Sequence, residues 1–437
     1  MATGSDYDVI VVGSGPAGGM AALSAAQLGL RVALVEEHAE VGAPTHCSGK
    51  LQLHAFREFD LPQHLVMNTL QAGAFYAPDG SVARVRRAEP DSHVVDRAVF
   101  DRWLADEAQR HGAELILRTR LRAAEQLNGL MRVNGEREGR AFSATAPLII
   151  DAEGARPALP ATLGLRLPRA YVLGLQYQMS GVDIEHEDCP EIYLGASTAP
   201  GFFAWLMPIG RGRGRVGLCV EPGPGTQSPI YYLERLIRDH PVASRRLRGA
   251  VVERKLAGPI PVLGARRPSV ARGMLIVGDA AGQVKATSGG GIYFSLIAGR
   301  LAAQGAHAFL GGDTGALRRY ETHWRARFGR ELNFTAFARV TLNHMTDPEL
   351  NAFIASIGDD EAFRHTVELR GDTAFQSRLM GPVLARLLRW SVARPVSSVL
   401  LKAFRFGLRA LWDGGAHTAS NSASAFESAA SEENHSR

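Results

Sequence analysis

The sequence is short of the features that several protein classes require. It has three cysteines in 437 residues. Because Cys47, Cys189 and Cys219 are scattered without a CxxC pair, they predict neither a disulfide framework nor a zinc site. No spacing of potential ligands is typical of a metal site, so we expect no metal, and the lipase-type G-x-S-x-G motif is absent. No uncharged apolar run reaches the roughly 18–20 residues that a membrane-spanning helix needs.

Charge and composition exclude further classes. The net charge of +5 is only mildly basic, and no basic patch interleaved with aromatic residues is present, so we expect no nucleic-acid partner. Apolar content of 46% and charged content of 21% are those of a globular protein with two or three domains. The first apolar run lies in an expected strand rather than in a signal peptide, and the scattered cysteines fit a reducing compartment, which favours a cytoplasmic location.

A nucleotide-binding pattern opens the chain. The apolar run 9–12 predicts a buried strand, the sequence Gly13-Ser14-Gly15-Pro16-Ala17-Gly18 follows, and an alanine-rich segment predicts a helix. A second apolar run ends at Glu36. In such a unit Gly13 permits a tight turn, Gly15 lets the backbone approach a pyrophosphate and Gly18 lets the helix pack closely. The pyrophosphate lies at the positive end of the helix, and Glu36 accepts hydrogen bonds from ribose hydroxyls.

Other patterns extend this picture along the chain. Buried strands are expected to end at Asp151 and just before Gly278-Asp279, and residues 288–292 to open a long helix. Asp79-Gly80 and Asn134-Gly135 predict hairpins, and residues 166–264 are strand-like. A second G-x-G-x-x-G at 212–217 precedes a β-type run and not a helix, so we interpret it as a hairpin turn. The sequence therefore predicts no second Rossmann unit and no separate nicotinamide domain.

Together these motifs resemble the flavin-dependent geranylgeranyl reductase family, within the flavoproteins built like hydroxybenzoate hydroxylase. The resemblance runs from about residue 5 to residue 375. It implies an α/β fold with a discontinuous Rossmann-like FAD-binding domain, an inserted antiparallel-sheet substrate domain and a C-terminal helical region. We expect the FAD-binding domain at 1–65, 92–165 and 265–310, the substrate domain at 66–91 and 166–264, the helical region at 311–412, and a disordered tail at 413–437.

The resemblance also implies cofactor contacts. The pyrophosphate of FAD is expected against the phosphate loop and its ribose at Glu36. Arg97 matches the arginine that contacts the cofactor, Asp279 the residue that binds the ribityl chain, and the amides of 290–292 face the pyrimidine ring of the flavin. The full expected set is Gly13, Gly15, Pro16, Ala17, Gly18, Glu36, Cys47, Ser48, Arg97, Asp279, Gly290, Gly291 and Ile292.

Two segments are similar to the reductases within this group. Residues 43–49 are similar to their cysteine loop beside the flavin, and Phe203-Ala204-Trp205-Leu206-Met207-Pro208 to the strand that lines their prenyl cavity. We expect Phe203, Trp205, Tyr193 and Tyr293 to contact substrate, with ordinary core packing as the alternative for each. Cys47 is the candidate catalytic residue, as a proton donor. Its alternatives are a passive place beside the flavin or simple packing.

The function that follows is FAD-dependent saturation of C=C bonds in geranylgeranyl or polyprenyl chains. The substrate is left open among a lipid, a diphosphate, a quinone and a chlorophyll-type ester, and the electron donor between NADPH and ferredoxin, an electron-transfer protein. One alternative is a flavin-dependent monooxygenase or halogenase, although Phe203 replaces the first Trp of the halogenase motif. Another is a flavin-bearing polyprenyl-lipid carrier without turnover.

The basic, apolar segment 379–412 has two interpretations. Lys402, Arg405 and Arg409 share one helical face by their spacing. The segment is either a helical layer packed on the core or an anchor on anionic lipid, and the second would make the protein peripheral at the inner membrane face.

Overall fold

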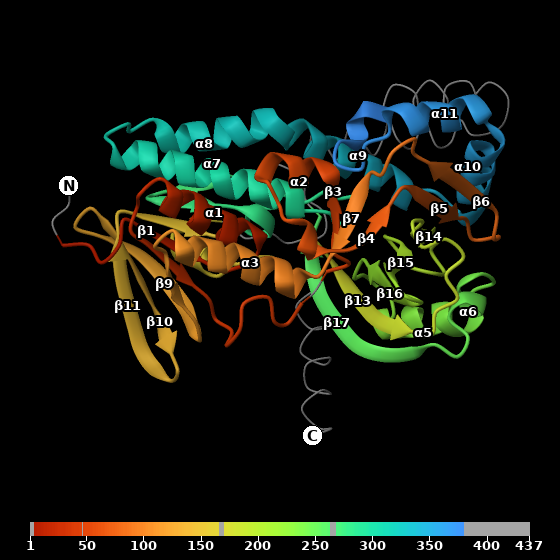
Figure 1. The fold of residues 1–437 in the computed structure, drawn as a ribbon, viewed down its shortest axis with the longest axis horizontal. Helices are drawn as coiled ribbons and strands as arrows, with labels where there is room; N and C mark the ends of the chain where they lie inside the picture. The colour runs from red at the N-terminus through yellow and green to blue at the C-terminus, as the bar shows by residue number, and fades with distance from the viewer. Residues whose placement is uncertain (1–3, 46, 166–169, 263–267, 380–437) are drawn as a thin grey trace.

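The computed structural model describes residues 4–45, 47–165, 170–262 and 268–379. Its central sheet has six strands in the order β18-β19-β12-β1-β2-β8. Figure 1 shows one of them, β1, next to the helix α1 (Pro16–Gln27). The strands from β19 to β8 are parallel, and β18 is antiparallel at the edge. In that order their bounds are Val270–Ala271, Met274–Ile276, Leu148–Asp151, Val9–Val12, Val32–Val35 and Glu114–Ile116. Segments far apart in the sequence thus build one mostly parallel sheet, and the expected α/β fold class is confirmed.

A small antiparallel sheet contradicts one expected turn. It consists of β9 (Thr119–Leu127), β10 (Leu130–Arg137) and β11 (Arg140–Ala146). The turns are at Asn128-Gly129 and Glu138-Gly139, where all four residues have positive φ, as two-residue hairpin turns prefer. The hairpin predicted around Asn134-Gly135 was wrong, because these residues lie inside β10 at a register shift. A Cβ on Gly135 would lie 2.2 Å from the carbonyl oxygen of Arg120, so glycine is required by a bulge here and not by a turn.

A seven-stranded sheet has the order β17-β13-β16-β15-β14-β5-β6. The turn Arg211-Gly212, with φ of 60° and 65°, joins β15 to β16, so the second glycine motif is a hairpin turn as predicted. The hairpin expected around Asp79-Gly80 is also confirmed, between β5 and β6. In sheet order the bounds are Val251–Pro261, Tyr171–Ser180, Arg213–Val220, Ala204–Gly210, Glu191–Tyr193, Ala72–Tyr76 and Val82–Arg86.

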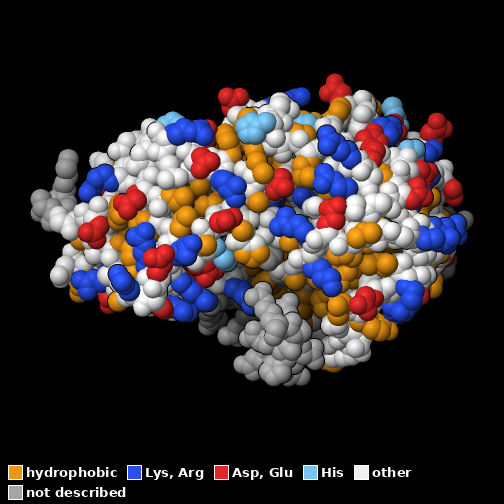
Figure 2. All heavy atoms as spheres, turned by 60° about the horizontal axis from the view of Figure 1, so that its bottom comes forward, with side chains coloured by type: hydrophobic (Ala, Val, Ile, Leu, Met, Phe, Trp, Pro, Cys, Tyr) orange, Lys and Arg blue, Asp and Glu red, His pale blue; other side chains and the backbone are white. Residues whose placement is uncertain are grey.

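The edge strand β17 starts at the molecular surface. Val251 is 63% exposed and Val252 38%, and the charged residues 253–255 that follow are exposed as well. Charges on an edge strand discourage pairing with another chain. Figure 2 shows hydrophobic side chains scattered in this way among charged ones across the face that it presents.

A third sheet joins the two larger ones. It consists of β3 (Lys50–Gln52), β7 (Ser92–Val95) and β4 (Val66–Leu70), and α2 (Leu53–Phe59) and η1 (Gln63–Leu65) connect β3 to β4. Within the segment 66–91, β5 and β6 therefore belong to the seven-stranded sheet, whereas β4 pairs with β7. The exact domain boundaries stay a prediction.

Helices lie both among the sheet strands and after the last of them. The short helices of the sheet region are α4 (Leu159–Thr162), α5 (Pro229–Asp239), α6 (Ala243–Arg246) and the 3-10 turn η2 (Gly278–Ala281). The later elements are α8 (Ala316–Trp324), the π-helical turn η3 (Arg325–Gly329), α9 (Arg330–Asn343), α10 (Asp347–Asp359), α11 (Glu361–Arg370) and η4 (Gln376–Leu379). The helical prediction is thus confirmed as far as residue 379. The predictions for residues 380–412 and for the tail at 413–437 lie outside the described residues.

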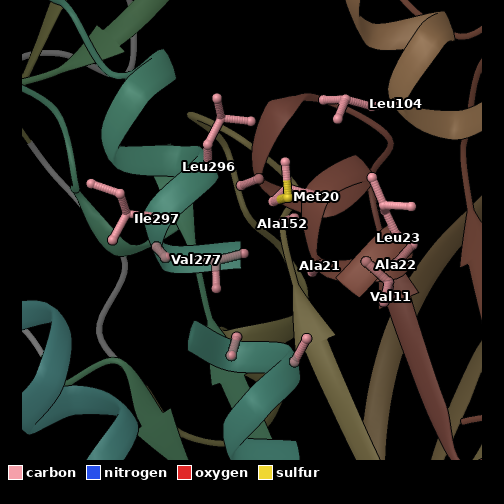
Figure 3. Packing of buried hydrophobic residues seen from close by; sticks show 14 of the residues in the cluster. Val11, Met20, Ala21, Ala22, Leu23, Leu104, Ala152, Val277, Leu296 and Ile297 are labelled. Carbon is pink, nitrogen blue, oxygen red and sulfur yellow. The ribbon is translucent and has the colours of Figure 1, made fainter. Parts of the chain in front are cut away.

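Strand alternation divides the packing around the central sheet between two cores. Val9 and Val11 of β1 face a core built with α1 (Pro16–Gln27), α3 (Arg97–Arg110) and α7 (Ile292–Leu310). Ile10 and Val12 face the opposite core under β9–β11, as the two-residue period of a strand requires. Figure 3 shows Met20 and Leu23 of α1 together with Leu104 of α3 and Leu296 of α7. This packing fixes the N-terminal ends of α1 and α7 beside the same edge of the sheet.

Candidate active site

The phosphate loop consists of residues 13–18, and each of its motif glycines has a different physical role. Gly13 has φ of +93°, and a Cβ there would lie 2.4 Å from the carbonyl oxygen of Ala152. A Cβ on Gly18 would lie 1.8 Å from the carbonyl oxygen of Gly13. No atom lies within 4 Å of a Cβ on Gly15, which caps α1 and lines a cavity together with Pro16 and Ala17. Gly13 and Gly18 thus hold the turn against β12, while Gly15 leaves space where a pyrophosphate would approach the helix end.

Glu36 holds the same loop from the end of β2. Its Oε2 accepts hydrogen bonds from the amide of Ser14 at 2.9 Å and from its Oγ at 2.6 Å, and its Oε1 accepts from the amide of His38 at 3.0 Å. Burial opposes ionisation, but these bonds keep the pKa of Glu36 below its usual value. Glu36 does not line the cavity, whereas His38 does. A ribose hydroxyl would therefore have to share or replace one of these bonds.

Arg97 and Asp101 form a buried pair at the start of α3. The guanidinium donates two hydrogen bonds to the carboxylate, at 3.1 Å and 2.9 Å. Burial disfavours the charged guanidinium, but Asp101 and then Cys47 outweigh it and raise the pKa of Arg97. Asp96 caps the helix by accepting from the amides of Ala98 and Val99. Arg97 lines the cavity and is close enough to Cys47 to interact with it electrostatically, so α3 presents a fixed cation beside the cysteine loop.

The cysteine loop is tied to the substrate-side sheet. The carbonyl oxygen of Cys47 accepts a hydrogen bond from Nε2 of Gln176 at 3.2 Å, and the carbonyl oxygen of Ser48 accepts one from Arg215 at 2.7 Å. Gly49 has φ of +82°, and a Cβ there would lie 2.2 Å from the carbonyl oxygen of Val95. Both Cys47 and Ser48 line the cavity. His46, in the same loop, lies outside the described residues.

Sequence reasoning missed Arg215, which is 4% exposed. Besides Ser48 it donates to the carbonyl oxygen of Val95 at 3.2 Å, so one guanidinium joins β16, β7 and the cysteine loop. Burial lowers the pKa of Arg215, and the nearby Cys47 and Asp96 oppose that shift. Arg215 lies inside the second glycine motif at 212–217, which the sequence analysis interpreted only as a hairpin turn. The signal in the sequence is an arginine directly before the β-type run at residues 216–220.

The end of β19 and the start of α7 meet the cavity from the other side. Asp279 lines it, and burial raises the pKa of this carboxyl to about 6 although Arg97 acts in the opposite direction. Gly290, Gly291 and Ile292 also line it, and Gly291 caps the 19-residue helix α7. The partial positive charge of a helix N-terminus therefore faces the cavity, which suits an anionic ring edge.

The cavity continues along β15 with a volume of about 2300 Å³. Phe203, Trp205 and Met207 line it, whereas Ala204 and Leu206 point into the core on the opposite face of the sheet. The rings of Phe203 and Trp205 meet edge to face with centroids 5.9 Å apart. Farther out, apolar residues of the C-terminal helices complete the wall, among them Phe334, Ile354 and Phe363. The part of the cavity lined by these aromatic and apolar residues is called the apolar chamber below. It is continuous with the space beside the phosphate loop.

The structure corrects two expected substrate contacts, because neither Tyr193 nor Tyr293 lines this cavity. Tyr193 is fully buried, stacks on Tyr76 with ring centroids 5.3 Å apart and donates a hydrogen bond to Glu191. Because side chains alternate along a strand, its neighbours Ile192 and Leu194 face the cavity instead. Tyr293 donates to Glu58 at 2.6 Å. It is the second residue of α7, and the helical turn of about 100° per residue directs it away from the face that carries Ile292.

Within the described residues, no group of three or more His, Cys, Asp and Glu is arranged to hold a metal ion. The same part of the chain contains no helix whose length and hydropathy together suit a membrane crossing.

Fold and site together define a flavoprotein, and comparisons with known proteins agree. Residues 8–155 match the family model of FAD-dependent oxidoreductases, and residues 171–257 match that of the geranylgeranyl reductase catalytic domain. The digeranylgeranylglycerophospholipid reductase 2 of Methanopyrus kandleri is 34% identical over 371 residues, which cover 82% of this chain and 92% of the relative. The chain therefore belongs to the geranylgeranyl reductase family and is an FAD-dependent oxidoreductase that reduces geranylgeranyl chains.

Solved structures agree on the fold. A geranylgeranyl bacteriochlorophyll reductase-like protein from Thermoplasma acidophilum has a TM-score of 0.78 at 24% identity, covering 85% of this chain and 95% of that one. A flavin-dependent brominase has a TM-score of 0.66 at 15% identity, covering 87% and 99%. The fold is thus shared with halogenases, and the sequence relatives favour the reductase over that alternative.

Proposed function

We propose that this chain saturates C=C bonds of geranylgeranyl chains carried on a membrane lipid, with a digeranylgeranyl glycerophospholipid as the first candidate. The observation that supports this most is the single cavity that begins at Gly15 and ends among Trp205, Ile354 and Phe363. A long isoprenoid needs an apolar chamber of this kind, whereas a small polar substrate does not. The name of the Methanopyrus relative supplies the choice of head group.

FAD fits the residues that are present. Gly15, Pro16 and Ala17 line the cavity and would face its pyrophosphate, on a turn that Gly13 and Gly18 shape. Glu36 would meet its ribose, whereas Arg97, Asp279 and residues 290–292 would contact the ribityl chain and ring. Cys47 and Ser48 would lie beside the ring. When bound, FAD supplies the hydride, and the protein supplies orientation and electrostatics.

The rest of the chemistry depends on positioning. An isolated trisubstituted alkene is a poor hydride acceptor, so the walls formed by Phe203 and Trp205 must hold one double bond flat and exclude water. Such orientation can lower a barrier by roughly 7–11 kcal/mol. The second hydrogen of the product arrives as a proton, and the thiol of Cys47 is the proposed donor because it lines the same space. Water is the alternative donor.

The proposed electron donor is NADPH or reduced ferredoxin. No second Rossmann unit is expected from the sequence, so NADPH would have to approach the flavin edge directly, and ferredoxin would instead dock as a protein partner. Anaerobic mixing of the FAD-loaded protein with each donor, followed at the flavin absorbance band, distinguishes them. The donor that bleaches the band within turnover time is the competent one.

Membrane-surface attachment is the last part of the proposal. Ile230 and Tyr231 at the start of α5 are each 44% exposed, and Ile230 also lines the cavity. Exposed apolar groups at the mouth would let a lipid pass from a bilayer into the chamber without crossing water. Co-sedimentation with vesicles tests this, and the variant Ile230→Ser/Tyr231→Ser should bind less than the matched control Val251→Ser/Val252→Ser.

The substrate assignment is tested by product analysis. FAD-loaded protein, reduced with dithionite, is incubated separately with a digeranylgeranyl glycerophospholipid, geranylgeranyl diphosphate and geranylgeraniol, and each product is analysed by mass spectrometry. We expect hydrogen addition to the phospholipid at the highest rate. Faster reduction of the diphosphate would reassign the substrate, and hydrogenation of none would contradict the proposed function.

A further inference from the structure

Lys285 is a buried cation that the reaction described above does not use. It lies between η2 and α7, is 3% exposed and lines the cavity. Its Nζ donates a hydrogen bond to the carbonyl oxygen of Thr373 and lies 5.9 Å from the ring centroid of Phe294. In the part of the chain that the structure describes, Lys285 forms no ion pair, whereas the neighbouring Lys50 pairs with Asp91 at 3.2 Å.

The surroundings make the charged form of Lys285 energetically unfavourable. Burial lowers its pKa to about 8, and the charge of Lys50 acts in the same direction, whereas Glu331, Asp372 and Asp91 oppose the shift from a distance. Removing an ammonium from water costs several kcal/mol unless a negative group compensates. Lys285 therefore lies where an incoming anion would be stabilised.

The geometry of Lys285 shows which end of the cavity its charge faces. The side chain folds over Gly290, so that a Cβ on Gly290 would lie 3.2 Å from Cε and 3.5 Å from Nζ. The backbone amide of Lys285 also donates to the carbonyl oxygen of Gly290 at 3.3 Å. Gly290 and Gly291 open α7, so the ammonium and the helix N-terminus act on the same end of the cavity.

We propose that Lys285 provides the positive charge that stabilises the reduced, anionic form of the bound flavin. The proposal rests on the proposed placement of the flavin ring at residues 290–292. A cation at that edge favours the reduced anion over the neutral oxidised form and so raises the reduction potential. Lys50 should contribute less, because Asp91 lies 3.2 Å from its Nζ and offsets much of its charge.

The test is the midpoint potential of FAD-loaded protein without substrate, measured by anaerobic titration against a reference dye. Lys285→Met should shift the reduction equilibrium tenfold or more toward the oxidised form, which is about 30 mV for a two-electron couple. Lys285→Arg should keep most of the wild-type value. Lys50→Met, the matched control, should change the equilibrium by less than about threefold. Lys285→Gln keeps a donor for Thr373 and is measured in the same way if Lys285→Met does not fold.

An unchanged potential in a Lys285 variant that still binds FAD would overturn the inference. If the same variant binds geranylgeranyl diphosphate more weakly but geranylgeraniol equally well, Lys285 is instead a head-group contact. Failure of the proposed function is a different result, namely a wild-type protein that keeps its potential but hydrogenates no prenyl chain.

Discussion

The indole Nε1–H of Trp205 donates a hydrogen bond to Oε1 of Gln176 across 3.0 Å. Because Nε2 of the same amide donates to the carbonyl oxygen of Cys47, Gln176 connects the wall of the apolar chamber to the cysteine loop. Gln176 is 5% exposed, so water has little access to replace either partner.

This relationship predicts the effect of Trp205→Phe. The substitution keeps an aromatic wall but leaves the buried Oε1 of Gln176 without its donor, which costs about 1–3 kcal/mol of folding stability. The loop of Cys47 should loosen as the amide rotates, and prenyl reduction should slow more than FAD affinity falls. Denaturant unfolding and flavin titration measure both effects. Phe203→Leu is the control on the same wall, and an equal loss of stability in that variant would show that packing alone is involved.

The thiol of Cys47 is tested by Cys47→Ala. If it donates the proton, the rate of prenyl hydrogenation should fall by about 10²-fold, the lower end of general acid catalysis. FAD binding should remain close to wild type. Cys189→Ala is the control, because Cys189 is buried away from the cavity. An unchanged hydrogenation rate in Cys47→Ala would leave water as the donor.

The phosphate loop predicts opposite failures for two glycines. Gly18→Ala places a Cβ 1.8 Å from the carbonyl oxygen of Gly13, so the variant should fold poorly or with a loss of several kcal/mol. Gly15→Ala meets no atom of the protein, so it should unfold like wild type but bind FAD at least about tenfold more weakly. Thermal unfolding of the apoprotein and flavin titration separate the two. Tight FAD binding by Gly15→Ala would contradict the proposed approach of the pyrophosphate.

His240 predicts a pH dependence of stability. Its Nδ1 accepts from the amides of Val242 and Ala243, and burial lowers its pKa to about 4. The unfolded chain binds this proton near pH 6.5, so the stabilising contribution is complete above that pH and is lost as pH falls toward 4. The loss is a few kcal/mol at most. Urea unfolding from pH 7 to pH 4.5 should show a shallower decline in His240→Asn than in wild type, and parallel declines would exclude this histidine.

Much of the fold was predictable from the sequence, because local patterns carry it. The glycine loop, the strand ending at Asp151 and the helix beginning at Ile292 each have a short-range signature of turn residues and apolar period, and the structure has all three. The hairpin predicted at Asn134-Gly135 was wrong because that prediction also used only a short-range signature. An Asn-Gly pair is a strong hairpin signal, but here the glycine is required by a close approach to the carbonyl oxygen of Arg120 from a neighbouring strand.

The candidate site was less predictable, because its contacts connect distant segments. Tyr193 and Tyr293 were chosen by residue type, and only the exact phase of the strand and helix turns them away from the cavity. Gln176, Arg215 and Lys285 were missed because each acts through tertiary partners, namely the loop at Cys47–Ser48 and Thr373. No short-range pattern in one sequence marks such a residue.

The central claim is that reduced flavin in this protein delivers its electrons to a prenyl double bond. The most direct measurement is anaerobic stopped-flow mixing of dithionite-free reduced holoprotein with a digeranylgeranyl glycerophospholipid, monitored at the flavin absorbance band. We predict return of the oxidised spectrum together with a hydrogenated lipid, at a rate that depends on lipid concentration. A flavin that stays reduced with the lipid, yet reoxidises with oxygen and an aromatic substrate that becomes hydroxylated or halogenated, would contradict the account.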